Sequence, residues 1–425
     1  MKVNNLILGA GIAGLGAAYV LRKAGQTALV VEKDATYGGL CGNIEKDGFR
    51  FDRFVHFTFT QNEEVNAIFK ASCGELIRHI PNPYNLYHSQ WIKHPAQNNL
   101  FPLSTEEKES IIKDFKARPF IDATYVPKNY EEWLRLQFGN YFAEHFPMVY
   151  TKKYWMKEAK ELRTEWVGNR VYQPSLDEVI AGSQTADTPM TYYAKEMRYP
   201  QKGGYKALLK SMADVANIEY GMCVAEIIPS EKKVRFTNGR EIDYDILYSS
   251  IPLPVVVDSI KNAPEVVRDA ANQLECTSGY HVSIALKTKN IPPYLWWYIY
   301  DEDILAARVY SPSLKSPDNA PEGCSSLQME VYCKENEFTE QELIDGTVGK
   351  LIKLRIIKEE DILFTHIGFE KYANVIFTEP IYRARKIVRD WLSEQGIKTI
   401  GRFGEWDYLW SDQSLLSGLH ANMQI

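Results

Sequence analysis

Residues 3–34 read VNNLILGAGIAGLGAAYVLRKAGQTALVVEKD. The first apolar run of this stretch is followed at once by glycines at the spacing G-x-G-x-x-G, namely Gly9, Gly11 and Gly14. Residues 15–24 are rich in alanine and leucine, which is typical of a helix, and a second apolar run over 28–31 ends in Glu32. The stretch therefore predicts a strand, a tight turn, a helix and a second strand, which form one βαβ unit with the dinucleotide-binding fingerprint.

Each residue type in this unit has a physical role. Gly9 allows the sharp exit from the strand, Gly11 lets the backbone approach a pyrophosphate, and Gly14 lets the helix pack closely on the strand. The helix N-terminus offers free N–H groups to phosphates, and Glu32 stands where a carboxylate accepts hydrogen bonds from an adenosine ribose. A secretory signal peptide is the alternative interpretation, but the glycine spacing and the immediate return to a strand argue against it.

The residues after Glu32 indicate which dinucleotide is expected. NAD-binding units usually continue directly into another helix, whereas this chain has a Gly38-Gly39 pair shortly after the acid. An ordinary surface turn is one reading of this pair. The pattern also resembles a large FAD-binding group that contains amine oxidases, protoporphyrinogen oxidase and UDP-galactopyranose mutase. The resemblance implies FAD as the cofactor and adds Lys33 and Leu40 to the expected cofactor site.

Composition limits the classes of function. The 425 residues suffice for two or three domains, and a formal net charge of -6 makes nucleic acid an unexpected partner. No uncharged apolar run after the first helix is long enough to span a membrane. The six cysteines have no metal-ligand spacing, so no metal site is expected, and without an export signal they indicate reduced thiols in a cytoplasmic protein. The sequence leaves open whether the chain forms a homo-oligomer.

The order of patterns predicts an α/β fold with a discontinuous Rossmann-type FAD-binding domain, an inserted helical domain and an inserted antiparallel-sheet domain that binds the substrate. The expected boundaries are 1–60, 196–253 and 370–425 for the FAD-binding domain, 61–195 for the helical insertion and 254–369 for the sheet domain.

Several elements are expected within these domains. Residues 48–59 alternate apolar and polar side chains and predict a strand. Residues 106–115 and 130–142 predict helices, and Asn238-Gly239 between two apolar runs predicts a hairpin. In the resembled group, a valine of a comparable strand supports the adenine through its backbone, which nominates Val224.

Two blocks of sequence narrow the resemblance to UDP-galactopyranose mutase. Trp155 is followed 15 residues later by Arg170, in a Gly-Asn-Arg-Val setting, and Arg308 begins the run Arg-Val-Tyr-Ser. In that family a tryptophan lines the sugar-nucleotide cleft, and the two arginines contact the diphosphate. Two guanidinium groups and a hydroxyl suit a diphosphate, and a tryptophan offers a flat apolar face to a sugar or uracil ring.

The C-terminal block, GRFGEWDYLWSDQS over 401–414, is similar to the same family. The resemblance implies that Gly401-Arg402 holds FAD, that Tyr408 hydrogen-bonds the substrate diphosphate, and that the N-terminus of a terminal helix meets the flavin. The expected flavin contacts of that helix, which is predicted from Ser414 onwards, are Asp412, Gln413 and Ser414.

Some residues depart from the family pattern. The mutases have small residues just before the histidine that matches His56, where this chain has Arg53-Phe54-Val55. Bulky residues there are expected to stiffen the loop and crowd the ring. A second diphosphate-binding tyrosine aligns with Phe377, and Asp412 stands where the family has asparagine. His56 itself is either a flavin-side residue or an ordinary strand histidine.

The resemblance implies a flavoenzyme that isomerises a nucleotide-activated sugar, such as a UDP-sugar, and changes its ring size through reduced flavin, with NAD(P)H as a candidate reductant and polysaccharide biosynthesis as the setting. An FAD oxidase or dehydrogenase of the amine oxidase or protoporphyrinogen oxidase type is the second hypothesis, favoured by Phe54, Val55 and Phe377. A flavin-binding scaffold without activity is the third.

Overall fold

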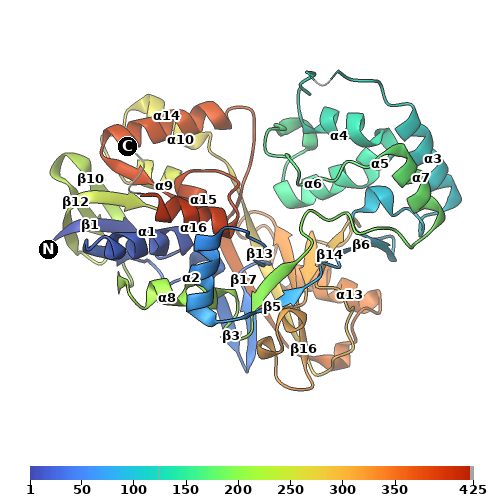
Figure 1. The fold of residues 1–425 in the computed structure, drawn as a ribbon, viewed down its shortest axis with the longest axis horizontal. Coiled ribbons are helices and arrows are strands. Elements are labelled where there is room, and N and C mark those ends of the chain that lie inside the picture. Colours follow the sequence, from blue (N-terminus) through green and yellow to red (C-terminus); the bar gives the residue numbers. More distant parts are fainter. Residues whose placement is uncertain (123, 422–425) are drawn as a thin grey trace.

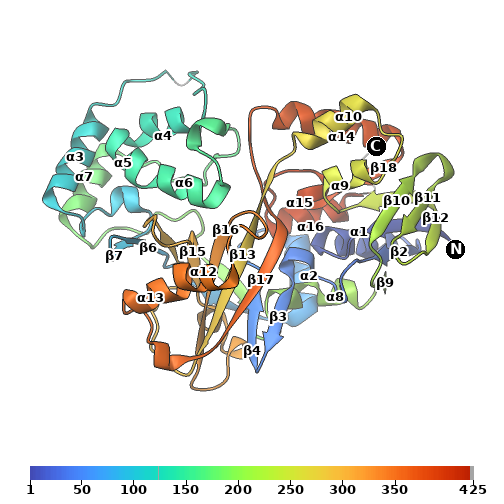
Figure 2. The same cartoon turned by 180° about the vertical axis from the view of Figure 1, so that it is seen from behind.

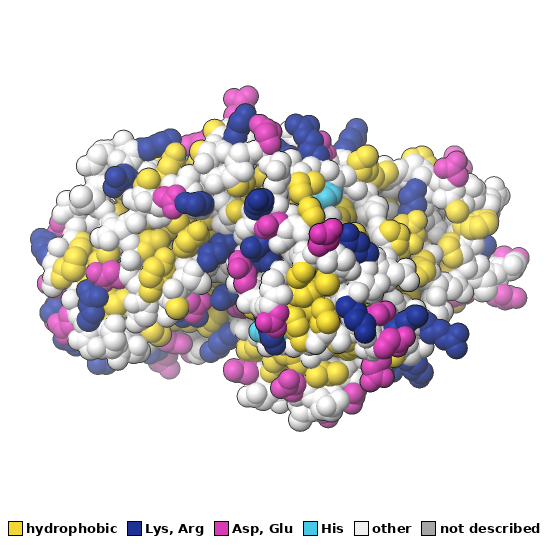
Figure 3. Space-filling model, turned by 90° about the horizontal axis from the view of Figure 1, so that it is seen from below, with side chains coloured by type: hydrophobic (Ala, Val, Ile, Leu, Met, Phe, Trp, Pro, Cys, Tyr) yellow, Lys and Arg dark blue, Asp and Glu magenta, His cyan; other side chains and the backbone are white. Residues whose placement is uncertain are grey.

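The computed structural model describes residues 1–122 and 124–421. Two seven-stranded sheets, two two-stranded sheets and a separate group of helices are the main parts of the described structure, and the N-terminus lies at the end formed by the first seven-stranded sheet (Figure 1). Among the described residues, no helix has both the length and the apolar character needed to cross a membrane. On the face seen in Figure 3, acidic and basic side chains are interspersed with apolar ones.

The first sheet carries the predicted βαβ unit. Its strand order is β10-β11-β12-β1-β2-β9, with β18 paired to β12, and its central strands β12, β1 and β2 run parallel. The strands are β1 Lys2–Leu8, β2 Ala28–Val31, β9 Asn217–Glu219, β10 Val224–Ile228, β11 Lys233–Phe236, β12 Glu241–Ser249 and β18 Ile397–Thr399. The turn before the helix, the helix itself (α1, Ile12–Lys23) and the hairpin at Asn238-Gly239 form as expected.

The second sheet has the order β17-β13-β16-β15-β14-β6-β7. All its pairs are antiparallel except β14 with β6, which run parallel. Its strands are β6 Tyr84–Tyr87, β7 Gln90–Lys93, β13 Cys276–Leu286, β14 Trp296–Ile299, β15 Arg308–Tyr310, β16 Ser325–Tyr332 and β17 Ile362–Val375. Every residue of β16 is buried, because this strand lies inside the sheet and is covered on both faces.

The group of helices stands beside the second sheet (Figure 2). It contains α3 Thr105–Lys116, α4 Tyr130–Phe138, α5 Asn140–His145, α6 Pro147–Trp155 and α7 Leu176–Gln184. The single helix expected over 130–142 is wrong, because Gly139 adopts φ +78° and separates α4 from α5. A Cβ at Gly139 would lie 2.8 Å from the backbone carbonyl carbon of Asp114, so the close packing of α3 also requires glycine there.

The long strand expected over 48–59 is also wrong. β3 (Asn43–Lys46) and β4 (Phe49–Asp52) form a hairpin that ends at Asp52. Phe54 then takes φ +60°, a left-handed conformation that a continuing strand cannot accommodate. Residues 53–59, which we call the cavity loop, therefore connect β4 to the rest of the chain without regular structure, apart from a single bridge at Thr58.

The remaining helices and strands support these parts. They are α2 Glu63–Cys73, β5 Leu76–His79, β8 Met197–Pro200, α8 Lys210–Ala213, α9 Leu253–Asp258, α10 Glu265–Asn272, α11 Pro312–Lys315, α12 Glu340–Ile344, α13 Lys350–Lys353, α14 Ile381–Glu394, α15 Gly401–Gly404 and α16 Ser411–Leu419, with short 3-10 turns at Gly39–Cys41, Ala96–Asn98, Ala159–Glu161, Tyr205–Leu209, Pro229–Glu231, Pro317–Asn319 and Glu359–Asp361 and a π-helical turn at Asp345–Gly349. The expected terminal helix corresponds to α16, which begins earlier than predicted, and residues 422–425 lie outside the described residues.

The division into three domains stays a prediction. β6 and β7 come from the range expected to be helical, but they pair into the second sheet, and β17 crosses the expected boundary at 369/370. We therefore propose that the second sheet and its helices extend to residue 375 and include 84–93.

Candidate active site

A single long cavity of about 1120 Å³ runs from the carboxyl ends of β1 and β2 to the group of helices. The cavity loop, β17, the turn before α16 and helix α6 contribute to its walls. Nearly all of the expected site residues line it: Gly9, Gly11, Glu32, Lys33, Gly38, Gly39, Leu40, His56, Trp155, Arg170, Val224, Arg308, Gly401, Arg402, Tyr408, Asp412 and Ser414. Gly14 and Gln413 are not part of the lining.

The three glycines of the first turn occupy three different environments. Gly9 has φ +96°, and it is this conformation that turns the chain out of β1. A Cβ at Gly14 would lie 2.0 Å from the carbonyl oxygen of Gly9, so Gly14 permits the close packing of α1 on the strand. A Cβ at Gly11 would meet no atom within 4 Å, because this position faces the open cavity. The arrangement leaves space for a ligand beside Gly11 and the N-terminus of α1.

The carboxylate of Glu32 lies directly beside this turn. Its Oε2 atom accepts a hydrogen bond of 2.8 Å from the backbone N–H of Ala10, and Oε1 accepts one of 3.0 Å from the backbone N–H of Asp34. Lys33 is exposed at the edge of the cavity and pairs with Asp34 at 2.8 Å. Glu32 is thus held in place by two backbone donors, and its remaining lone pairs are available to hydroxyl donors.

The Gly38-Gly39 pair packs against the first turn. The N–H of Gly38 donates to the carbonyl of Ala10 at 2.9 Å, and a Cβ at Gly39 would lie 3.3 Å from the Cα of Gly11. Both glycines have positive φ, +130° and +55°. Together with Val224 at the start of β10, they form the walls around the end of the cavity next to β1 and β2.

The segment from α15 to α16 closes the cavity from the other side. Gly401 has φ +75°, and a Cβ there would lie 2.5 Å from the Cβ of Ala13 in α1. Arg402 donates to the carbonyl of Leu409 at 2.9 Å and to Oδ1 of Asn374 at 2.8 Å. The Nε of Arg402 and the Nδ2 of Asn374 are buried without a partner among the described residues.

Helix α16 presents its first turn to the cavity. Asp412 and Ser414 line the cavity, whereas the exposed Gln413 accepts a hydrogen bond of 2.9 Å from the backbone N–H of Trp410. Gln413 is therefore placed as the capping residue of α16 and not as a cavity residue.

Arg170 lies at the end of the cavity near the helices. Its guanidinium group stacks between the rings of Tyr408, 4.8 Å away, and Trp410, 5.0 Å away. It donates to the carbonyls of Trp166 at 2.8 Å and Tyr408 at 3.2 Å, while its Nε has no partner within the described ranges. None of the described carboxylates forms an ion pair with Arg170, so its charge is available to an anion.

Arg308 is in a different situation. Its Nη2 atom lies 2.6 Å from Oε2 of Glu330, and its Nε donates to the same oxygen at 2.9 Å. The side chain of Glu330 is fully buried and also accepts hydrogen bonds from Tyr332 and from the backbone N–H of Val55. The charge of Arg308 is therefore balanced within the protein.

Aromatic rings surround these two arginines. The Trp155 ring lies 5.5 Å from that of Tyr408, and the hydroxyls of Tyr408 and Tyr154 are 3.3 Å apart. Phe377 packs beneath Tyr408 and does not line the cavity. Phe54 is buried and stacks on Tyr332 at 5.8 Å.

His56 stands on the cavity loop and stacks on Tyr205 with the ring centres 4.9 Å apart. Burial lowers the pKa of His56 to about 4, so the ring is neutral near pH 7. It is thus a cavity residue outside any strand.

Sequence reasoning missed His94, Asn374, Glu330 and Trp410. Asn85 donates through Nδ2 to the carbonyls of Ile92 and Lys93, so its Oδ1 faces Nδ1 of His94 at 3.0 Å. His94 therefore carries its proton on Nδ1, which leaves Nε2 as an acceptor, and the residue lines the cavity. Among the missed residues, Glu330 had a sequence signal, because it is a single charge within the otherwise uncharged strand SSLQMEVY.

Comparison with known proteins adds to this geometry. Residues 12–392 match the family described as flavin containing amine oxidoreductase. Prolycopene isomerase from Daucus carota is 24% identical over 327 residues, which cover 68% of this chain and 53% of that protein. Phytoene desaturase from Fusarium fujikuroi is 22% identical over 305 residues, which cover 60% of this chain and 50% of that protein. The chain thus spans about half the length of these curated relatives.

Two solved structures resemble the chain over almost its whole length. Reduced UDP-galactopyranose mutase matches with a TM-score of 0.92 and 23% identity, over 99% of this chain and 94% of the other. Wild-type putrescine oxidase bound to putrescine matches with a TM-score of 0.69 and 14% identity, over 100% and 99%. These likenesses confirm the expected fold class, a Rossmann-type domain with inserted domains.

Proposed function

Because this chain belongs to the family of flavin-containing amine oxidoreductases, we propose that it is an FAD enzyme that isomerises a nucleotide-activated sugar. The cofactor is FAD, as the family and its structural neighbours indicate. The identity of the substrate, a nucleotide sugar, is the more specific part of the proposal. It is supported by the chemistry of the end of the cavity near Arg170.

The residues of the cavity fit FAD. The open position at Gly11 and the N-terminus of α1 suit a pyrophosphate, and Glu32 suits a ribose. Arg402 lines the same cavity, and its Nε has no hydrogen-bond partner among the described residues, so the side chain has donor capacity left for the cofactor. When bound in its reduced form, FAD supplies the electron-rich centre that a ring isomerisation of this kind requires, and NAD(P)H is the proposed reductant.

The observation that carries the substrate proposal is the state of Arg170. This guanidinium faces the cavity, is held between Tyr408 and Trp410, and has no acidic partner among the described residues. A phosphate group in the cavity would balance its charge. Tyr408 adds a hydroxyl, and Trp155 adds an aromatic surface for a base or sugar ring. The many rings around them limit the access of water to the reacting group.

The experiment uses the purified holoprotein, reduced anaerobically with dithionite. UDP-galactopyranose and UDP-galactofuranose are added separately, and their interconversion is followed by chromatography. Turnover that depends on reduction and is lost in Arg170→Ala supports the proposal. An Arg163→Ala variant is the control, because Arg163 pairs with Glu165 at the surface. If neither UDP-sugar nor UDP perturbs the flavin spectrum, the nucleotide-sugar proposal fails.

An FAD oxidase or dehydrogenase is the second candidate. The specific observation in its favour is that Glu330 balances the charge of Arg308, which leaves Arg170 and Arg402, both over the ring of Tyr408, as the guanidinium groups without an acidic partner at this end of the cavity among the described residues. Together with Phe54 and the surrounding tyrosines, this makes much of the wall neutral and aromatic. Oxygen uptake or dye reduction with amines and polyenes, in the absence of any response to UDP, would favour this candidate. Residence in the cytoplasm is a further proposal, which localisation of a tagged protein tests.

A further inference from the structure

Lys315 is a fully buried lysine outside the cavity. It is the last residue of α11, and its Nζ lies 2.5 Å from Oδ2 of Asp52, whose side chain is also fully buried. The rings of Tyr199 and Tyr310 lie 4.5 Å and 4.7 Å from the ammonium group, and that of Phe57 lies 5.6 Å away. Removing two charges from water costs free energy, so a buried ion pair of this kind does not by itself stabilise the fold. A role other than stabilisation is therefore needed to account for the pair.

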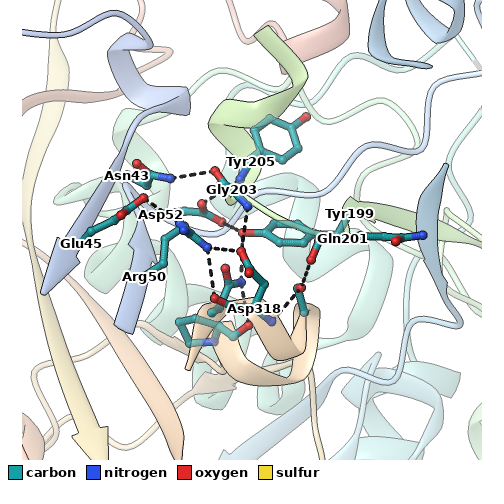
Figure 4. A network of polar contacts seen from close by, with 12 residues as sticks. Asn43, Glu45, Arg50, Asp52, Tyr199, Gln201, Gly203, Tyr205 and Asp318 are labelled. Carbon is teal, nitrogen blue, oxygen red and sulfur yellow. Dashed lines mark hydrogen bonds and ion pairs between the residues drawn. The ribbon is translucent and has the colours of Figure 1, made fainter. Parts of the chain in front are cut away.

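Asp52 joins this lysine to several segments. Its Oδ2 also accepts a hydrogen bond of 2.6 Å from the hydroxyl of Tyr199, and its Oδ1 accepts one of 3.0 Å from the backbone N–H of Tyr205. Its own carbonyl accepts a hydrogen bond of 3.0 Å from the hydroxyl of Tyr310. Figure 4 shows Asp52 between Tyr199 and Tyr205. Because Asp52 ends β4, these contacts fix the point from which the cavity loop starts.

Tyr205 extends the connection to two walls of the cavity. Its ring stacks on His56 of the cavity loop, and its hydroxyl lies 2.5 Å from Oγ of Ser411. Ser411 is the first residue of α16, which presents Asp412 and Ser414 to the cavity. A continuous series of contacts therefore leads from α11 to both elements that flank the expected flavin ring.

We infer that Lys315 is a positioning residue of the FAD site. Its ammonium group holds the Asp52 carboxylate, and through Asp52 and Tyr205 it fixes the cavity loop and the first turn of α16. The ion pair thus sets where His56 and the helix N-terminus stand relative to the flavin. The inference rests on the FAD site and not on the identity of the substrate.

A second ion pair at the same junction provides a control. Arg50 lies 2.5 Å from Asp318, which also accepts a hydrogen bond of 2.9 Å from the backbone N–H of Gly203 (Figure 4). This pair links β4 to the turn after α11, whereas Lys315–Asp52 links β4 to α11 itself. Among the described residues, neither Arg50 nor Asp318 forms a side-chain hydrogen bond or ion pair with the cavity loop or α16. Asp318→Asn therefore weakens the junction without touching the series of contacts described above.

The test compares four FAD-loaded proteins. They are the parent, the single variants Lys315→Met and Asp318→Asn, and the double variant that combines Lys315→Met with Asp52→Asn. We expect every variant to bind one FAD per chain. In the two Lys315 variants, the visible circular dichroism and the absorption bands of the flavin should shift, whereas Asp318→Asn should retain the parent spectra. Lys315→Arg keeps the charge but not the shape of the ammonium group, and it serves in the same comparison if Lys315→Met does not fold.

Parent-like flavin spectra in a folded Lys315 variant would overturn the inference, and so would an equal spectral shift in Asp318→Asn, because the effect would then belong to the junction in general. Neither result depends on whether UDP-sugars are turned over. Failure of the substrate proposal therefore leaves this test intact, and the reverse is also true.

Discussion

Arg308 and Glu330 form an ion pair with two contacts, 2.6 Å and 2.9 Å long, on neighbouring strands β15 and β16. The same carboxylate accepts a hydrogen bond of 2.9 Å from the backbone N–H of Val55, so one side chain links Arg308 to the cavity loop. An anion that approaches Arg308 would compete directly with Glu330 for its donors.

Glu330→Gln is expected to destabilise the protein by about 3 kcal/mol, because it leaves the Arg308 guanidinium without its buried counter-charge. Chemical unfolding of the apoprotein measures the change. Glu337→Gln, at an exposed position, is the control and should change the free energy of unfolding by less than about 0.5 kcal/mol. If Glu330→Gln lowered the free energy of unfolding by less than about 1 kcal/mol, Arg308 would have found another partner.

Arg170→Lys is expected to weaken the binding of UDP about tenfold, which corresponds to about 1.4 kcal/mol, because an ammonium group reproduces the charge but not the fork of donors or the stacking on Tyr408 and Trp410. Titration of the oxidised holoprotein, followed through the flavin spectrum, gives the affinity. The weakening should persist when the salt concentration is raised, since the contact lies in a partly enclosed cavity. Equal affinities of the parent and Arg170→Lys would remove Arg170 from the anion site.

The two glycines Gly11 and Gly14 should respond differently to alanine. Gly14→Ala places a Cβ 2.0 Å from the carbonyl of Gly9 and is expected to destabilise even the apoprotein, by about 2 kcal/mol. Gly11→Ala meets no protein atom, so the apoprotein should unfold as before while FAD binds more weakly. Thermal unfolding with and without FAD separates the two effects. If Gly11→Ala left the FAD-induced shift unchanged, the pyrophosphate would not lie beside Gly11.

Acid should destabilise the fold through two cavity histidines. Burial lowers the pKa of His94 to about 3 and that of His56 to about 4, whereas the ordinary value is 6.5. Below pH 6.5 these histidines bind protons in the unfolded chain but not in the folded protein. The free energy of unfolding therefore decreases as the pH falls towards 4. Each histidine steepens this loss by up to about 1.4 kcal/mol per pH unit.

The measurement is the free energy of unfolding between pH 4 and 7 for the parent, His94→Gln and His420→Gln. His94→Gln should flatten the dependence on pH, and the exposed His420→Gln should leave it unchanged. Parallel curves for all three proteins would mean that His94 is protonated in the folded state.

The sequence could predict those parts of the structure whose conformation is determined by residues close together in the chain. The glycine spacing from Gly9 to Gly14 requires a tight turn and close helix packing at fixed positions, and the structure has both. The errors arose where distant segments decide the conformation. Gly139 breaks a helix because Asp114 packs against it, and Phe54 leaves the strand direction where Glu330 binds the adjacent N–H.

The same distinction, between local and distant determinants, decides which residues of the candidate site could be predicted from the sequence. Arg170, Tyr408 and Arg402 belong to recognisable blocks of sequence, and all three line the cavity. Lys315 and Glu330 do not line the cavity, and their importance comes from partners 263 and 22 residues away in the chain. Of these two, Glu330 has a sequence signal, because it is the single charge of its strand. Whether Arg308 is free or balanced by an acid could be decided only from the pairing of β15 with β16.

The pairing of the first sheet has a consequence for biosynthesis. β12 is bordered on one side by β1, from the beginning of the chain, and on the other by β18, at residues 397–399. Helix α16, which packs against α1, follows even later. A ribosome must therefore synthesise the chain as far as residue 419 before the wall of the FAD site can close, and until then the edge of β12 that pairs with β18 and the face of α1 that packs against α16 stay uncovered.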